Sequence, residues 1–177
     1  MSTVLALASE GGVAIAGDKQ ASDDGTVTSR NVERVFQIEG SGVGAVGQPA
    51  DVQRFRRELE AELRQIRLQT DDEVDIDKRA RIAGRLADQS DVAAVIAGYD
   101  ADGIARLREI RPDGGIFDQS TVALGDGAEL AAGQLETVEP GLDIDALVTT
   151  VTEILGRVAT RDVTTGDELE VWSLPHA

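Results

Sequence analysis

The sequence predicts a layered α+β fold in which two β-sheets pack face to face and a pair of helices covers each outer side. Strand-like and helix-like segments come in groups along the chain, which argues against a repeating βαβ arrangement. The main helical segments each carry one apolar stripe, so each needs one covered face. The predicted order is four strands, two helices, about three strands, two helices and one strand.

Two β-hairpins are predicted at the start of the chain. Residues 3–9 (TVLALAS) and 12–17 (GVAIAG) are small, apolar and β-branched, and a Glu-Gly pair separates them as a turn. Residues 34–38 (RVFQI) and 42–47 (GVGAVG) form the second pair. The glycines of residues 42–47 predict a close backbone approach or a bulge. Residues 23–25 (Asp-Asp-Gly) mark a further turn.

The apolar spacing changes after Pro49, which suits the first turn of a helix. Apolar residues then recur every three or four positions to about residue 69, as one stripe of an amphipathic helix: Val52, Phe55, Leu59, Leu63 and Ile66. A second helix is predicted over about residues 75–89, followed by strands at 92–99, 104–110 and 121–124. Helices at about 128–137 and 143–160 and a strand at 169–174 complete the chain. No repeat or linker is visible, so we expect one domain over residues 1–177.

The composition excludes several kinds of site. The chain has no cysteine, which removes disulfides, thiol nucleophiles and thiolate metal sites. Its one histidine, His176, is next to last and is expected to be solvated, so we expect neither a metal site nor a cofactor. No apolar run reaches the ~18 residues of a membrane span. Nor does the N-terminus have the charge and apolar pattern of a secretory signal, and we expect a cytoplasmic protein.

The net charge is -16, from 33 acidic and 17 basic residues, and it argues against nucleic acid as a partner. The only lysines are Lys19 and Lys78. So much like charge repels itself in dilute buffer, whereas ~1 M salt screens it within about 3 Å. Our hypothesis is a halophilic protein from a salt-rich cytoplasm. The alternative is an ordinary acidic protein from a GC-rich genome, which favours Arg over Lys.

Four stretches of sequence follow one another in a distinctive order: residues 2–7 (STVLAL), 12–22 (GVAIAGDKQAS), 29–38 (SRNVERVFQI) and 44–53 (GAVGQPADVQ). In this order they resemble the proteasome β-subunit family and the related bacterial HslV peptidase. A later stretch, residues 161–167 (RDVTTGD), is similar to the family's late active-site loop. The resemblance covers nearly the whole chain. It implies a four-layer αββα sandwich of the N-terminal-nucleophile hydrolase type.

In that family the N-terminal residue attacks the peptide bond, and its own free amine acts as the base. The resemblance places Ser2 in the nucleophile's position, where the family nearly always has threonine. An α-amino group has a reference pKa of ~7.7–8.0, so it can accept the proton of a hydroxyl near neutral pH. Met1 precedes Ser2, and methionine before a small residue is commonly removed. We therefore expect Ser2 to become the terminal residue.

The resemblance also assigns the remaining site residues. Asp18 matches the acidic residue that fixes a cation beneath the nucleophile. Asp162 and Thr165 match groups beside the terminal amine, and Gly47 matches the glycine whose N–H serves as the oxyanion donor. The walls of the pocket for the residue before the cleaved bond match Ala21, Val32 and Ala45, which predict a small or open apolar pocket.

Two positions depart from the family pattern. Arg34 stands where the family has lysine, and an arginine stays charged and does not shuttle a proton easily. Asp126 stands where the family has a serine that assists the amine. Lys19 does not replace that lysine, because it follows Asp18 in an extended strand and is expected to point the other way. Some site residues also have an ordinary structural interpretation. Asp18, Asp162 and Thr165 are typical turn formers, and Asp18 with Arg34 could form a purely structural buried ion pair.

Three functions stay open at this point. The first is a threonine- or serine-type endopeptidase of protein degradation that acts on polypeptides through Ser2. The second is a catalytically silent scaffold subunit, which the departures at Arg34 and Asp126 favour. The third is a related terminal-nucleophile amidohydrolase or amide-transfer enzyme that acts on a small substrate. The resemblance implies a ring, either of copies of this chain or with other proteasome-type subunits.

Overall fold

The computed structural model describes residues 2–70 and 74–177. Over these residues the elements follow one another as β1 (Thr3–Ser9), β2 (Gly12–Asp18), β3 (Ala21–Asp23), β4 (Thr26–Ser29), β5 (Val35–Ile38), β6 (Ser41–Val46), α1 (Pro49–Gln69), α2 (Ile76–Ser90), β7 (Ala93–Tyr99), β8 (Ala105–Ile110), β9 (Ile116–Gln119), β10 (Thr121–Gly125), α3 (Ala128–Leu135), α4 (Ile144–Ala159) and β11 (Leu169–Pro175). Each element that the sequence predicts is present, with its bounds within one or two residues of those expected.

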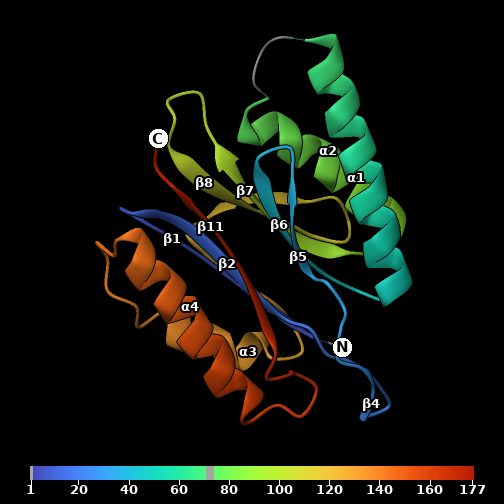
Figure 1. Ribbon diagram of the computed structural model, residues 1–177, viewed down its shortest axis with the longest axis vertical. Coiled ribbons are helices and arrows are strands. Elements are labelled where there is room, and N and C mark those ends of the chain that lie inside the picture. Colours follow the sequence, from blue (N-terminus) through green and yellow to red (C-terminus); the bar gives the residue numbers. More distant parts are fainter. Residues whose placement is uncertain (1, 71–73) are drawn as a thin grey trace.

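The elements form four layers, and the predicted α+β sandwich is confirmed (Figure 1). One antiparallel sheet has four strands in the order β10-β1-β2-β11, and the other has five in the order β5-β6-β7-β8-β9. Helices α1 and α2 cover the outer face of the five-stranded sheet, and α3 and α4 cover the four-stranded one. A separate hairpin, β3-β4, projects from the end of the sandwich where β1 begins.

Three apolar layers hold the sandwich together, and strand alternation distributes residues between them. In β1, Val4 and Ala6 face the other sheet, whereas Leu5 and Leu7 face α3 and α4. Successive side chains of a strand point to opposite faces, so a strand buried on both sides is apolar throughout. The third layer lies between the five-stranded sheet and the α1–α2 pair and is centred on large side chains such as Phe55.

Three strands were not predicted from the sequence: β3, β4 and β9. Their residues are mostly exposed or partly exposed, and every residue of β9 is exposed. A strand that buries little apolar surface has no clear alternation of apolar and polar residues for a sequence pattern to detect. The turn predicted at residues 23–25 is the turn of the β3–β4 hairpin, where Asp24 and Gly25 adopt positive φ angles of 45° and 76°.

The predicted close approach at the glycine-rich strand is confirmed in β6. A Cβ atom on Gly42 would lie 2.0 Å from the ring of Trp172, and one on Gly44 would lie 2.5 Å from Val4. Both contacts come from the opposite sheet. The two sheets therefore approach each other closely because β6 lacks side chains at these positions.

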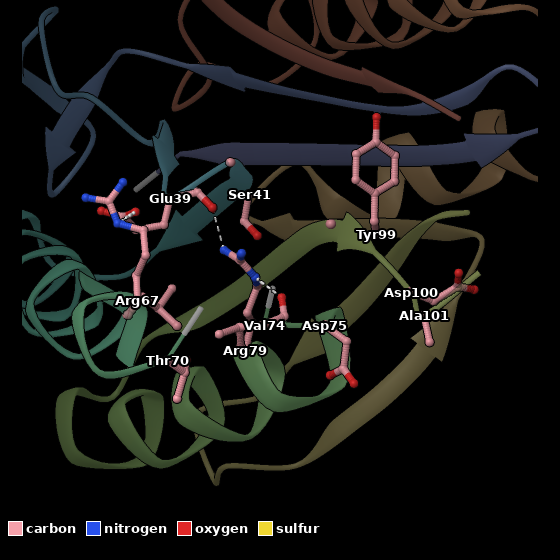
Figure 2. Close-up of a pocket in the computed structure, with 13 residues that line it drawn as sticks. Glu39, Ser41, Arg67, Thr70, Val74, Asp75, Arg79, Tyr99, Asp100 and Ala101 are labelled. Carbon is pink, nitrogen blue, oxygen red and sulfur yellow. Dashed lines mark hydrogen bonds and ion pairs between the residues drawn. The ribbon is translucent and has the colours of Figure 1, made fainter. Parts of the chain in front are cut away.

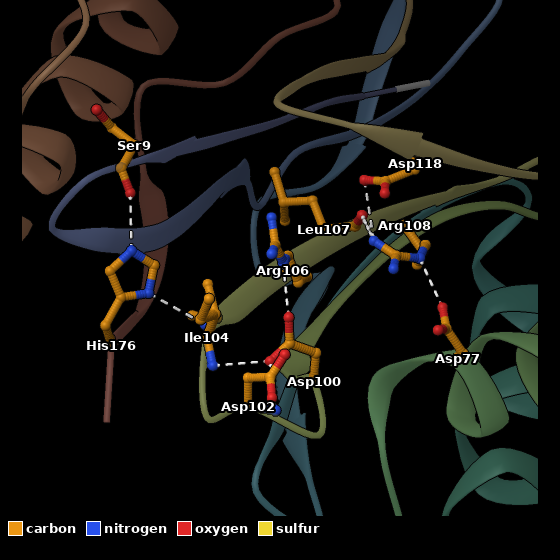
Figure 3. A network of polar contacts seen from close by, with 11 residues as sticks. Ser9, Asp77, Asp100, Asp102, Ile104, Arg106, Leu107, Arg108, Asp118 and His176 are labelled. Atoms are coloured by element: carbon orange, nitrogen blue, oxygen red, sulfur yellow. Dashed lines mark hydrogen bonds and ion pairs between the residues drawn. The ribbon is translucent and has the colours of Figure 1, made fainter.

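The C-terminal tail is fastened at the end of the sandwich opposite the β3–β4 hairpin, and there the expectation of a solvated histidine is wrong. His176 accepts a hydrogen bond at Nδ1 from the backbone N–H of Ala105 (3.1 Å), and its Nε2 lies 3.2 Å from the carbonyl of Ser9 (Figure 3). This pattern uses the neutral ring with its proton on Nε2. Nearby, Arg108 links Asp77 of α2 to Asp118 of β9.

Candidate active site

The residues proposed for catalysis lie around the start of β1, and hydrogen bonds or a shared cavity link them. They come from six segments: Ser2 before β1, Asp18 at the end of β2, Arg34 before β5, Gly47 after β6, Asp126 after β10, and Asp162 and Thr165 between α4 and β11. Residues more than a hundred positions apart in the sequence thus meet at one end of the two sheets (Figure 1).

Ser2 is fully buried. The peptide group between Ser2 and Thr3 is hydrogen-bonded at both its carbonyl and its N–H. Its carbonyl accepts a hydrogen bond from the N–H of Asp126 (3.1 Å), and the next N–H, that of Thr3, donates to Asp18 (2.7 Å). The Ser2 hydroxyl, by contrast, has no hydrogen-bond partner among the described residues. Met1 lies outside the described residues. The peptide is therefore fixed while the hydroxyl is left without a partner.

Asp18 is fully buried and joins three segments through backbone N–H groups. Its Oδ1 accepts from Thr3 (2.7 Å), and its Oδ2 accepts from Gln20 (3.0 Å) and Gly166 (2.8 Å). Burial raises the pKa of this carboxyl above its ordinary value, and the three N–H groups and Arg34 counteract part of that rise. No nitrogen of Arg34 lies within 4 Å of Asp18, so the two attract each other without forming an ion pair.

Asp162 and Thr165 belong to a compact turn after α4. Asp162 accepts hydrogen bonds from the N–H of Thr164 (3.0 Å) and from the hydroxyl of Thr165 (2.5 Å). Burial favours a higher pKa for Asp162, but these hydrogen bonds outweigh it, and the net pKa is below the ordinary value. The Thr165 hydroxyl also lies 2.8 Å from the hydroxyl of Thr3. This turn is therefore attached directly to β1.

Arg34 is a buried cation (1% exposed) on the floor of a cavity. One of its terminal nitrogens donates weakly to the carbonyl of Gly47 (3.4 Å), and its Nε has no partner among the described residues. Burial lowers the pKa of Arg34, and three carboxylates oppose that effect: Asp18, Asp126 and Glu170. An arginine pKa starts so high that the side chain stays charged.

Glu170 is a member of this site that the sequence analysis did not identify. It accepts hydrogen bonds from the backbone N–H groups of Arg34 (3.0 Å) and Val35 (3.3 Å), and its other oxygen lies 3.9 Å from the ammonium of Lys19. A carboxylate near the start of a mostly apolar strand, LEVWSL, is the signal that points to it. Lys19 therefore pairs with Glu170 on β11.

The cavity beside Arg34 has a volume of about 530 Å³. Of the three residues expected to form its walls, Ala21 lines it, whereas Val32 and Ala45 are not among the lining residues and Ala45 is fully buried. The lining is more polar than those three residues alone suggest. It also contains Arg34, Gly47, Asp126, Thr164, Ser22, Asp23, Asp24, Gly25, Thr28, Gln48 and Pro49.

A larger cavity, of about 630 Å³, lies elsewhere, between the ends of α1 and α2 and the turns after β5 and β7 (Figure 2). It shares no described lining residue with the cavity beside Arg34. Its charged groups already have partners: Arg79 donates to the carbonyls of Val74 and Glu39, and the carboxylate of Glu39 pairs with Arg67 at 2.9 Å. The chemistry that the sequence predicts therefore belongs to the smaller cavity.

The arrangement around Ser2 contains side chains of the kinds that nucleophilic catalysis requires. In the described part of the chain, no group of three His, Cys, Asp or Glu side chains is placed to hold a metal ion. No described helix is long and apolar enough to cross a membrane. A hydroxyl without a partner, a buried cation and a fixed set of carboxylates and N–H groups can activate a nucleophile and stabilise negative charge on a substrate oxygen.

Comparisons with known proteins show the family to which the chain belongs. The family model described as proteasome subunit matches residues 1–174. Proteasome subunit beta 1 of Desulfurococcus amylolyticus is 30% identical over 96% of this chain and 87% of its own length. Proteasome subunit beta of Natrialba magadii is 30% identical over 93% of this chain and 70% of its own. Proteasome subunit beta 2 of Korarchaeum cryptofilum is 26% identical over 97% and 90%.

Proposed function

Because this chain belongs to the proteasome subunit family, we propose that it is a peptidase subunit that cleaves polypeptides through the hydroxyl of Ser2, once Met1 has been removed. The observation that carries the proposal is the state of Ser2. Its hydroxyl is buried with no partner among residues 2–70 and 74–177, while the peptide beside it is held by Asp18 and Asp126. A buried polar group with no hydrogen bond costs stability. Ser41 and Ser90 also bury hydroxyls without a partner among the described residues, so what singles out Ser2 is its place between Asp18 and Asp126.

The residues have distinct roles in the proposed reaction. The Ser2 oxygen forms a bond to the carbonyl carbon of the substrate, and the proton of the hydroxyl passes to the free amine of Ser2. The N–H of Gly47 and the charge of Arg34 stabilise the oxyanion that forms. The amine then gives its proton to the departing nitrogen as the peptide bond breaks. Water finally hydrolyses the ester and restores the hydroxyl.

The amine of Ser2 must perform every proton transfer, because Arg34 retains its proton. This amine therefore has to be neutral when the enzyme starts, and its orientation falls to Asp126, Asp162 and Thr165. In the structure Asp162 and Thr165 are hydrogen-bonded to each other and, through Thr3, to β1. That link supports their assignment to the neighbourhood of the terminal amine.

Hydrolysis of fluorogenic peptides tests the proposal. The wild-type protein, with loss of Met1 verified by mass, is expected to hydrolyse them, and S2A is expected to fall to the background rate. S2T is expected to remain active because it keeps the hydroxyl. S173A, a change on the exposed face of β11, is the matched control and is expected to equal the wild type. Equal rates for S2A and the wild type would exclude Ser2 as the nucleophile.

A scaffold subunit without catalysis is the second candidate, and the side chains at Arg34 and Asp126 favour it. An R34K/D126S variant restores the side chains that the family resemblance implies. A wild-type protein that assembles but neither hydrolyses peptides nor reacts with a peptide epoxyketone would establish the scaffold function. Activity gained only in R34K/D126S would then locate the loss of catalysis in these two residues.

We also propose that the chain assembles into a ring, either with copies of itself or with other proteasome-type subunits, and that it works in a salt-rich cytoplasm. The family supports the first statement, and the net charge of -16 supports the second. Native mass spectrometry of the protein purified in high salt tests the assembly. A monomer at all concentrations and salt levels would contradict the ring.

A further inference from the structure

Thr3 is the first residue of β1 and the neighbour of Ser2, and it is completely buried. It makes three hydrogen bonds, each to a different segment of the chain. Its N–H donates to Asp18 (2.7 Å), and its hydroxyl contacts the N–H of Gly127 (2.9 Å) and the hydroxyl of Thr165 (2.8 Å). Its N–H and its hydroxyl are thus both bonded, whereas the Ser2 hydroxyl has no partner in the part of the chain that the structure describes.

The direction of each hydrogen bond in this cluster follows from the groups themselves. An ionised carboxylate only accepts, so the Thr165 hydroxyl donates to Asp162. A hydroxyl has one proton, so Thr165 accepts from Thr3 at its oxygen. The Thr3 oxygen in turn accepts from the N–H of Gly127. The chain of bonds therefore runs one way, from Gly127 through Thr3 and Thr165 to Asp162.

The packing around this chain of bonds leaves no space for rearrangement. A Cβ atom on Gly127 would lie 2.6 Å from the Thr3 hydroxyl, 3.2 Å from the Thr165 hydroxyl and 2.5 Å from a methyl group of Val158. Carbon atoms in ordinary contact are ~3.5–4.0 Å apart. The glycine lets the turn after β10 approach Thr3 closely enough to bond with it, so the three segments meet at one oxygen atom.

We propose that Thr3 is a positioning residue for the reaction at Ser2: its hydroxyl fixes Thr165 and Asp162 relative to the peptide that carries Ser2. The inference rests on the proposed function. Asp162 and Thr165 act on the amine of Ser2, and Thr3 is attached to Ser2 by a covalent bond. The Thr3 side chain thus fixes Asp162 and Thr165, which orient the amine, at a set distance from that amine.

Two variants separate the hydroxyl of Thr3 from its shape. T3V removes the hydroxyl and keeps the branched shape, whereas T3S keeps the hydroxyl. T152V is the control, because the Thr152 hydroxyl donates to the carbonyl of Val148 in its own helix, away from the site. A small misplacement of catalytic groups can cost about 100-fold in rate, so T3V is expected to lower kcat by about 10- to 100-fold with KM within about twofold. T3S is expected to stay within about threefold of the wild type.

The pH profile gives a readout that a merely structural role would not move. In T3V the Thr165 oxygen no longer accepts from Thr3, so it can accept from the ammonium of Ser2 and favour the charged form. The acid limb of kcat/KM is expected to move to higher pH in T3V and to stay unchanged in T3S and T152V. Unchanged kcat and pH profile in T3V, or equal losses in T3S and T3V, would overturn the proposal.

Hydrogen exchange distinguishes failure of this inference from failure of the proposed function. The Gly127 amide donates to Thr3, so it is expected to exchange at least about tenfold faster in T3V than in T3S or T152V. If the wild type is inactive and only T3V exchanges faster, the peptidase proposal fails and Thr3 is an anchor with no reaction to serve, which overturns the positioning role. If the wild type is active and T3V changes neither exchange nor rate, the inference about Thr3 alone is overturned.

Discussion

Replacing Asp18 with asparagine tests the claim that this carboxylate organises the site through backbone hydrogen bonds. Asparagine keeps one acceptor oxygen and places an NH2 group where the other was. In the better orientation its oxygen serves Gln20 and Gly166, and the NH2 group faces the N–H of Thr3. A buried donor without a partner costs about 1–3 kcal/mol. Relief from burying a charge offsets part of this cost, so we expect D18N to lose about 2 kcal/mol.

For a chain of this length a loss of about 2 kcal/mol lowers Tm by about 4–8 °C. Thermal and urea unfolding of D18N, measured beside D88N, provides the assay. Asp88 is exposed on α2, so D88N removes the same charge without removing a buried acceptor and is expected to unfold as the wild type does. Peptidase activity of D18N is expected to fall with its stability, because the Thr3 N–H adjoins Ser2. If D18N unfolds like D88N, Asp18 does not anchor these segments, and our reading of its hydrogen bonds is refuted.

Three further predictions concern the backbone at the site, pH and salt. G125A is expected to lose at least about 3 kcal/mol of stability, since Gly125 has a φ of 92° and an added Cβ would lie 1.8 Å from the Ser2 carbonyl. The control G133A has open space around the substituted residue in α3 and is expected to be neutral or stabilising. Comparable unfolding of the two variants would contradict this prediction. Folding lowers the pKa of Asp162, so the ionised carboxylate stabilises the fold fully above the ordinary pKa of 3.8, and this contribution is lost as pH falls through the folded-state pKa. The difference in unfolding free energy between the wild type and D162N, measured by urea titration, should therefore narrow at acid pH. The Tm should rise as KCl increases from about 0.1 to 1 M, over which screening shortens from about 10 to 3 Å; a flat Tm would contradict the halophilic assignment.

The regular elements were predictable because most of them bury an apolar pattern. The buried stripe of Val52, Phe55, Leu59 and Leu63 predicts α1, whose bounds are Pro49 and Gln69. The strand β9, by contrast, has no buried residue, so it adds few apolar contacts that its sequence could reveal. Its existence follows from the free edge of β8, with which it pairs, and an edge is a property of the assembled sheet.

The candidate site was less predictable, because it depends on distances between segments. Resemblance pointed to Ser2, Asp18 and Asp162, but neither resemblance nor periodicity pointed to Thr3 or Glu170. Thr3 contacts Thr165 across 162 positions of sequence, and Glu170 reaches the backbone of Arg34 across 136. The one local hint at Thr3 is a polar residue at the start of a strand that is otherwise apolar to Ala8.

The measurement that most directly tests the role of Ser2 is reaction of the natively produced protein with a peptide epoxyketone, followed by intact and peptide mass analysis. This reagent needs both a hydroxyl and a free amine on the same residue. We expect that Met1 is absent, that one adduct forms per chain on Ser2, and that S2A forms none. Retention of Met1 with no adduct, or an adduct on another residue, would contradict it.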